Sequence, residues 1–268
     1  MHSKLIGKDS AKIFYNKFYD LIEPDCAAIV RYAHFDSAQM RFNGGFRDLL
    51  KVDTTIILAE GNYSSNGLKN GEFVTRYVNG NLQAKGYYKN GNFYGGWVFY
   101  WPNGHIDQQT NFINGYYDGD CMFYYENGRP NTHMKIRGYS CEILDAWNEE
   151  GVKIVNSGNG DYTLYDRGLT WQGKVVNGIP EGIWAFQVSD AVYGSELFEK
   201  GKFVKGLNHN ILGNQDYNDK SRINFMPHVP ELDVSKANRF TIFHDSPCDT
   251  TKYVREGNVI RSHLKIFD

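Results

Sequence analysis

The sequence has little proline, few cysteines and no long apolar run. Only 7 of its 268 residues are Pro, so it is not a proline-rich disordered chain. No apolar stretch approaches the roughly 18 residues that suggest a transmembrane helix. The net charge is −2, so no basic field favours nucleic acid as a partner. The four cysteines show no C-x-x-C spacing, and we expect neither a metal site nor a cofactor; they are Cys26, Cys121, Cys141 and Cys248.

The N-terminal residues, Met1 to Lys8, lack the apolar core of a signal peptide. Two interpretations remain open. Either the protein is cytoplasmic, or the chain is a trimmed mature form that is periplasmic or secreted.

What the sequence does contain is a repeat within residues 71–128. A glycine, a large residue two positions later, an aromatic or Thr-rich run and a closing Asn-Gly pair return twice at a spacing of 24 residues. A fixed period of this length is typical of repeat architectures. The three copies begin at Gly71, Gly95 and Gly119 and close at Asn79-Gly80, Asn103-Gly104 and Asn127-Gly128.

Each repeat carries turn signals that predict a β-hairpin. Asn-Gly is the strongest short hairpin signal, because a type I′ turn needs positive φ at both central residues. Further pairs lie at Asn90-Gly91 and Asn114-Gly115. Strand alternation then predicts two faces. The apolar inner face carries Phe73, Thr75, Tyr77, Leu82, Ala84, Tyr88, Trp97, Phe99, Trp101, Ile106, Gln108, Phe112, Cys121, Phe123, Tyr125, Pro130, Thr132 and Ile136, and the mixed outer face carries Arg76, Gln83, Lys85, Tyr100, Asp107, Gln109, Tyr124, His133 and Lys135.

The pattern resembles the MORN repeat in its bacterial form, G-x-W-x-x-Y-x-x-N-G followed by an aromatic-Lys-Asn-Gly turn. The matching positions are Gly71, Phe73, Tyr77, Gly80, Tyr88, Lys89, Asn90, Gly91, Gly95, Trp97, Trp101, Gly104, Gly119, Tyr125 and Gly128. A weaker copy, Gly173 to Trp184, matches Gly86 to Trp97 at identical internal spacing. The resemblance covers about residues 56–206 and implies a binding or scaffold module, since MORN-like repeats serve in many such settings.

We therefore predict a mainly all-β protein, an elongated antiparallel β-meander of MORN-like hairpins with short helical caps. Residues 1–55 form an N-terminal cap, residues 56–206 the repeat sheet, and residues 207–268 a C-terminal cap or appended region. Helical spacing of apolar residues predicts a helix over residues 8–22, and a second short helix is expected near residues 231–239. Residues 208–222 are polar and rich in Asn and Asp, which indicates a loop.

No group of residues predicts an enzyme. The cluster from Phe243 to Asp249 contains His244, Asp245 and Cys248, but a polar turn explains it better, because catalytic groups are assembled by the fold and adjacent side chains usually diverge. His209 and His228 fall in expected loops, Glu149-Glu150 is a charged turn, and Gly158-Asn159-Gly160 is too short for a phosphate-binding loop. We expect no catalytic residues.

The leading hypothesis is a non-enzymatic module that binds a protein partner; the MORN resemblance suggests an antitoxin or immunity role as one form of it. Arg76, Tyr100 and Tyr124 stand at one repeat position on the outer face, and Tyr and Arg are enriched in interfaces. We name these three as the partner-binding residues; solvated cross-strand pairing is the alternative. Carbohydrate or cell-envelope binding through exposed aromatics is the second hypothesis, and a cysteine hydrolase a remote third.

Overall fold

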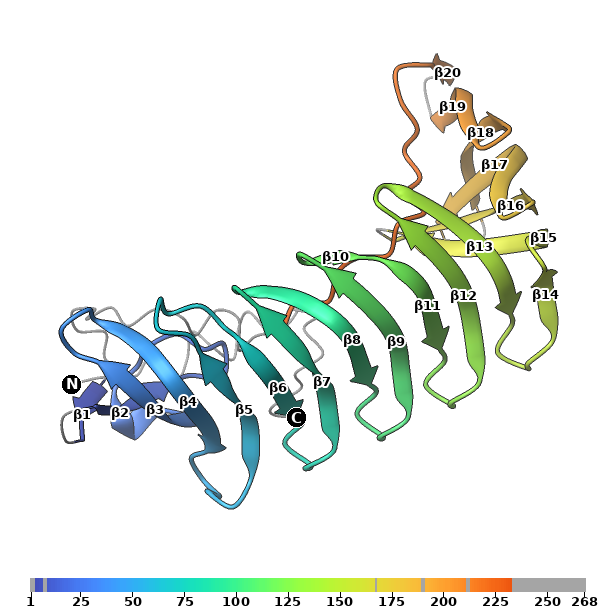
Figure 1. Ribbon diagram of the computed structural model, residues 1–268. Helices are drawn as coiled ribbons and strands as arrows, with labels where there is room; N and C mark the ends of the chain where they lie inside the picture. The colour runs from blue at the N-terminus through green and yellow to red at the C-terminus, as the bar shows by residue number, and fades with distance from the viewer. Residues whose placement is uncertain (1–2, 7–8, 167, 189–190, 211–212, 233–268) are drawn as a thin grey trace. The chain divides into compact units, whose positions relative to one another are not determined.

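A computed structural model describes residues 3–6, 9–166, 168–188, 191–210 and 213–232 (Figure 1). Outside one short 3₁₀ turn, η1 (Pro24–Cys26), the regular structure in these ranges is β. The strands are β1 (Ser3–Leu5), β2 (Ser10–Tyr15), β3 (Ile29–Asp36), β4 (Arg41–Leu50), β5 (Ile57–Tyr63), β6 (Gly71–Arg76), β7 (Leu82–Lys89), β8 (Asn92–Tyr100), β9 (Ile106–Ile113), β10 (Tyr116–Tyr117), β11 (Gly119–Tyr124), β12 (Pro130–Arg137), β13 (Ser140–Trp147), β14 (Lys153–Asn156), β15 (Asn159–Asp166), β16 (Leu169–Val176), β17 (Ile179–Val188), β18 (Ala191–Glu199), β19 (Lys202–Asn210) and β20 (Gly213–Tyr217).

The strands form an open antiparallel meander, which confirms the predicted fold class. From β1 to β8, and again from β11 to β20, each strand pairs antiparallel with the next along the chain. Sequence neighbours are therefore neighbours in space, as expected for hairpins in series. No helix in the described ranges is long and apolar enough to cross a membrane.

The predicted helix over residues 8–22 is wrong. Ser10–Tyr15 form β2, which pairs with β3 from Ser10 opposite His34 to Tyr15 opposite Ile29. Ala11, Ile13 and Tyr15 are buried while the residues between them are not, so the period is two rather than 3.6. Pairing with a neighbouring strand overrides the weak helical spacing. The second expected helix, near residues 231–239, lies outside the described residues except for Glu231 and Leu232, which are not helical.

The predicted loop over residues 208–222 is wrong for its first half. β19 continues to Asn210 and pairs with β20, with Gly206 opposite Tyr217. The Gly, Asn and Asp residues that suggested a loop here lie in a terminal hairpin, whose backbone hydrogen bonds override low strand propensity.

The Asn-Gly pairs reverse the chain as predicted, but in two geometries. Asn90-Gly91, Asn114-Gly115 and Asn177-Gly178 have positive φ at both residues, as a type I′ turn requires. At Asn79-Gly80, Asn103-Gly104 and Asn127-Gly128 only the glycine has positive φ. Gly80 N–H donates to the Tyr77 carbonyl and Tyr77 N–H to the Asn81 carbonyl, the pattern of a longer hairpin loop that ends in a left-handed glycine.

The chain forms two compact units. Among the described residues, unit 1 contains those within 3–106, 112–115 and 230–232, and unit 2 contains those within 107–111 and 116–229. The predicted domain boundaries near residues 55 and 206 stay a prediction.

In unit 1 the predicted inner face is the buried one, and aromatic rings pack along it in succession. The prediction is wrong beside the bulge of β6, where Gln83, expected on the outer face, is buried and Leu82 is only half-buried. Phe73 contacts Tyr88 at 4.7 Å between ring centroids, Tyr88 contacts Trp97 at 5.2 Å, and Phe93 contacts both Trp97, at 4.5 Å, and Phe112, at 5.0 Å. Phe73 and Phe112 are fully buried, and Trp97 is 1 % exposed. Edge-to-face ring pairs add to the burial of apolar area, so this row of rings holds successive hairpins together.

In unit 2 the weaker sequence copy repeats the local structure of the stronger one. Gly173 lies over the Trp184 ring as Gly86 lies over the Trp97 ring. Trp184 Nε1 donates to the Lys174 carbonyl at 3.2 Å, and Trp97 Nε1 donates to the Tyr87 carbonyl at 2.9 Å. The spacing from Gly to Trp thus encodes one structural unit in both copies.

Candidate functional site

The three predicted partner-binding residues are half-buried and lie in both units. Arg76 ends β6 and Tyr100 ends β8, both in unit 1, whereas Tyr124 ends β11 in unit 2. Each directly precedes the residue that starts an Asn-Gly loop, which places them at equivalent points of their hairpins. The Tyr124 hydroxyl donates to Gln109 Oε1 at 3.0 Å. Their role in binding stays a prediction.

Arg76 belongs to a charged cluster on the outer face of unit 1. Its Nη1 lies 3.1 Å from Glu60 Oε1, and Arg47 Nε lies 3.5 Å from Glu60 Oε2. The Arg47 side chain is 65 % exposed, while those of Glu60 and Arg76 are below 30 %. Because the Arg47 side chain is accessible to water, its ion pair with Glu60 contributes little to stability, and the Arg47 guanidinium remains available to a ligand.

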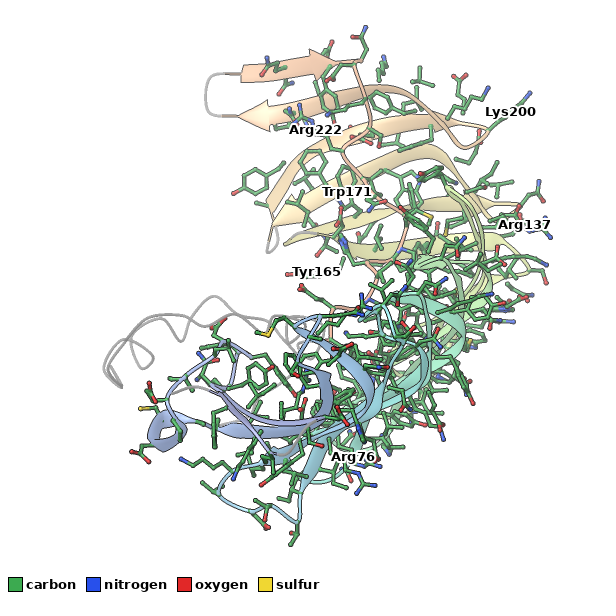
Figure 2. The ribbon with its side chains drawn as sticks, turned by 60° about the vertical axis from the view of Figure 1, so that its left-hand side comes forward. Arg76, Arg137, Tyr165, Trp171, Lys200 and Arg222 are labelled. Atoms are coloured by element: carbon green, nitrogen blue, oxygen red, sulfur yellow. The ribbon has the colours of Figure 1, made fainter. Side chains whose placement is uncertain are left out.

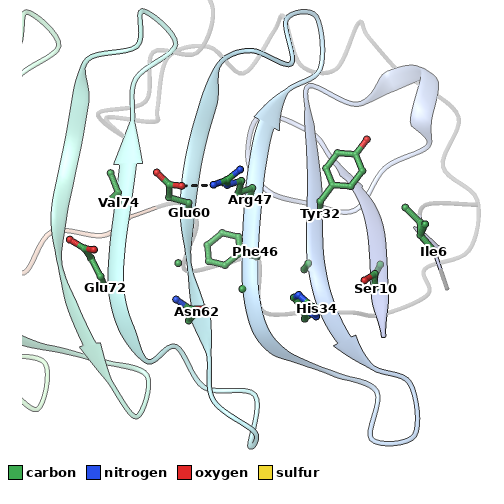
Figure 3. A pocket seen from close by; sticks show the side chains of 14 residues that line it. Ile6, Ser10, Tyr32, His34, Phe46, Arg47, Glu60, Asn62, Glu72 and Val74 are labelled. Carbon is green, nitrogen blue, oxygen red and sulfur yellow. Dashed lines mark ion pairs between the residues drawn. The ribbon is translucent and has the colours of Figure 1, made fainter. Parts of the chain in front are cut away.

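A groove of about 820 Å³ opens on the same face, across strands β2 to β6. Figure 3 shows its side chains on neighbouring strands, with a dashed line for the Arg47–Glu60 ion pair. One wall follows the cross-strand line from Tyr32 to Arg47, Glu60 and Val74, in which each residue lies opposite the next. The remaining lining residues are Ile6, Ser10, Ala11, Ala33, His34, Gly45, Phe46, Gly61, Asn62 and Glu72.

Gly45 leaves the gap that deepens this groove. It lies opposite Asn62, at a position from which a side chain would point outward like its neighbours. A Cβ there would meet Asn62 Oδ1 at 3.5 Å and the Gly61 carbonyl at 4.0 Å, which are ordinary contacts. A Cβ therefore has room at position 45, and a longer side chain built on it would extend into the groove.

Exposed tyrosines lie beside the groove in unit 1, where Tyr87 is opposite the lining residue Glu72. Tyr87 lies opposite Tyr94 and the two are 51 % and 41 % exposed. Lys89 Nζ lies 4.8 Å from the Tyr94 ring centroid. Tyr32, within the groove, is 41 % exposed. Large rings that combine apolar area with a polar end are typical of interfaces.

The catalytic and metal-binding candidates considered from the sequence do not come together as a site within the described residues. The cluster from Phe243 to Asp249 lies outside those residues. Over the described ranges no group of three or more His, Cys, Asp or Glu side chains could hold a metal ion. His209 and His228 are exposed, and Cys121 is a buried thiol that lies 3.0 Å from Thr110 Oγ1, in agreement with its interpretation as a small core residue.

The sequence analysis missed the groove because it assigned residues 1–55 to a cap. A signal was present: Tyr32 and His34 alternate with buried Ala33 and Phe35 in the manner of a strand with one wet face. The depth of the groove could not be predicted from the sequence, because it depends on which strands lie beside Gly45.

Comparison with known proteins adds no family assignment: no protein-family model matches the chain, and no curated protein matches it. The MORN resemblance therefore stays a prediction that rests on the repeat residues themselves.

Proposed function

We propose that the protein is a non-enzymatic interaction module that binds a protein partner through the outer face of its sheet. The observation that carries the proposal is the groove across β2 to β6, next to the Arg47–Glu60–Arg76 cluster. Its polar groups carry both signs of charge, and exposed Tyr32, Tyr87 and Tyr94 stand within or beside it. A partner segment with alternating charged and apolar side chains suits such a surface.

The predicted residues Arg76 and Tyr100 of unit 1 are part of this proposal, and Tyr124 stays a predicted binding residue of unit 2. Arg76 connects to the groove through Glu60. The MORN resemblance suggests one form of this activity, in which the protein neutralises a toxin by binding it.

Carbohydrate binding is the second candidate, and Tyr32 favours it. An exposed ring beside carboxylate and amide groups, here Glu60 and Asn62, can stack on a sugar while the polar groups accept and donate hydrogen bonds. A glycan-binding screen separates the two candidates, since a protein-binding module gives no signal above that of an unrelated protein.

The protein-binding proposal is tested by affinity capture followed by measurement with the purified partner. The first variant carries Arg76→Ser, Tyr100→Ser and Tyr124→Ser, and the second carries Gly45→Leu, which fills the groove. We expect each to weaken partner binding at least tenfold while circular dichroism shows an unchanged fold. The matched control is Tyr139→Ser, since Tyr139 is 93 % exposed in the turn between β12 and β13. Unchanged affinity in both folded variants would place the binding surface elsewhere.

A further inference from the structure

A segment without secondary structure runs along the inner face of unit 2. After β20, residues 218–229, here called the strap, form no strand. Most of the strap is exposed or half-buried, and only Ile223 is buried. The strap is therefore held by a few anchoring contacts with side chains of the sheet.

The first anchor is Glu196, a carboxylate of β18 that is 1 % exposed. Ser221 Oγ donates to its Oε2 at 2.6 Å, and Arg222 N–H donates to its Oε1 at 2.7 Å. The Tyr217 hydroxyl donates to the same Oε1 at 2.7 Å. A buried carboxylate needs such donors, because losing them would leave an uncompensated charge. Two consecutive residues of the strap thus supply a matched pair of donors.

The second anchor is an aromatic pocket. The Phe225 ring packs edge-to-face on Trp184, at 4.9 Å between centroids and an interplanar angle of 89°, and on Phe198, at 5.9 Å and 82°. Trp184 is fully buried, so Phe225 covers its inner side. Aromatic side chains that fill well-packed pockets are typical of the residues that dominate binding energy at interfaces.

The third anchor is a hydrogen bond to the backbone of the strap. The Tyr117 hydroxyl donates to the His228 carbonyl at 3.1 Å, and His228 Nε2 lies 3.7 Å from Asp166 Oδ1. The same face also holds a hydrogen-bond donor that the strap leaves unused, because Trp171 Nε1 is buried without a partner. Figure 2 labels Trp171 on the sheet and Arg222 on the strap.

We propose that the inner face of unit 2 is a recognition groove for an extended peptide of a partner protein, and that the strap occupies it in cis. The partner peptide carries a Ser, whose hydroxyl and following backbone N–H are the paired donors, and a Phe four residues after that Ser. Glu196 binds the paired donors, Trp184 and Phe198 hold the ring, and Tyr117 fixes the backbone. The strap competes at the high effective concentration of a tethered ligand, so the groove opens to a partner only when the strap is displaced. This site is separate from the outer face and does not depend on the function proposed for it.

The test uses a fluorescein-labelled peptide with the sequence of residues 217–230 and the full-length chain, with binding followed by fluorescence anisotropy. Phe225→Ala in the chain removes the ring that holds the strap, so we expect this variant to bind the peptide at least tenfold more tightly than the wild type does. A peptide with Phe replaced by Ala should lose this binding. Near-UV circular dichroism checks that the variant retains its packed core.

Arg222→Pro in the chain gives a second route if Phe225→Ala fails to fold. Proline removes the N–H that donates to Glu196, and the exposed Arg222 side chain lies over the Tyr217 ring, 4.3 Å from its centroid, rather than in the core. The same gain in peptide affinity is expected. The proposal is overturned if a folded variant binds the wild-type peptide no more tightly than the wild-type chain does, or binds it no more tightly than the peptide without Phe.

Discussion

Three charged side chains are buried inside unit 1. Arg31 and Asp48 are fully buried and form a bidentate pair, with Nε to Oδ1 at 2.6 Å and Nη2 to Oδ2 at 2.7 Å. Arg31 Nη1 also donates to the Tyr63 hydroxyl at 3.2 Å. Lys69 is 2 % exposed, with Nζ 4.7 Å from the Tyr88 ring centroid and 5.5 Å from that of Phe73. The Arg31 and Asp48 charges neutralise each other, whereas the amino group of Lys69 is buried beside them without a carboxylate of its own among the described residues.

Burial is the main reason why the pKa of Lys69 falls to about 7. The positive charge of Arg31 lowers this pKa further, and Asp48 opposes both effects. In the unfolded chain Lys69 has its ordinary pKa of 10.5 and binds a proton that the folded state gives up. Between these values the unfolded state binds more protons, so stability rises with pH.

We therefore expect the free energy of unfolding to increase from pH 7 towards pH 10. A shift of this size corresponds to at most about 5 kcal/mol. Above pH 10 stability should fall again, because burial raises the pKa values of Tyr15, Tyr63 and Tyr88 and the unfolded chain then loses protons first. Urea unfolding at a series of pH values measures both limbs.

Lys69→Met should raise the unfolding free energy at pH 7 and flatten its rise up to pH 10, since the substitution removes the cost of burying the ammonium group. Lys85→Met is the control, because the Lys85 side chain is 52 % exposed. A wild-type protein whose stability falls between pH 7 and pH 9, or a Lys69→Met variant that is less stable at pH 7, would contradict this account.

At the scale of elements, hydrogen bonds at the loops connect one hairpin to the next. The Tyr77 hydroxyl donates to the Tyr100 carbonyl at 2.7 Å, and the hydroxyl of Tyr125, two repeats further along, donates to the Trp147 carbonyl at 2.8 Å. Asn79 Nδ2 likewise donates to the Pro102 carbonyl at 2.9 Å. The aromatic residue and the Asn of the motif therefore have a second use beyond forming their own turn.

Close packing between the two strands of a hairpin explains why a glycine stands at position 86, over the ring of Trp97. A Cβ at Gly86 would lie 2.2 Å from Trp97 Cδ2, so Gly86→Ala should destabilise the protein by about 1–3 kcal/mol through overpacking. Gly45→Ala is the matched control: it is also a strand glycine, but its Cβ has room, and we expect no loss of stability. Thermal unfolding of both variants checks the difference, and equal melting temperatures would contradict the packing of Trp97 beneath Gly86.

At the scale of the whole molecule, each hairpin packs mainly on its sequence neighbours. In such arrays stability is approximately a sum of local terms and nearest-neighbour terms. The two compact units have separate aromatic cores, one around Trp97 and one around Trp184. A local defect should therefore spread through its own unit first.

Trp97→Ala should cost about 3–5 kcal/mol, because the ring is fully buried, and should raise amide hydrogen exchange mainly in residues 57–100. Trp184→Ala should raise exchange mainly in residues 159–206. Hydrogen exchange read by mass spectrometry distinguishes the two patterns. If either substitution raised exchange equally in both units, the chain would unfold as one cooperative body instead.

The sequence by itself determined the repeat, the turns and the inner face. Asn-Gly pairs and strand alternation act over a few residues, so Phe73, Trp97 and Cys121 could be assigned to the core from their spacing alone. The same local rules predicted that Gly173 to Trp184 copies Gly86 to Trp97. They failed for residues 8–22, where the spacing of apolar residues fits both a helical period of 3.6 and a strand period of two. Pairing with β3 is what makes residues 10–15 a strand.

The tertiary structure alone decided which outer positions form a groove and which polar groups are buried. Arg31, Asp48 and Glu196 look like surface residues in the sequence, and they are buried because segments distant in the chain cover them or supply their partners. Gly45 creates a hollow only because Tyr32 and Asn62 stand beside it on the two neighbouring strands. Local sequence fixes the direction in which a side chain points from its strand, but what it meets there depends on contacts between residues far apart in the sequence.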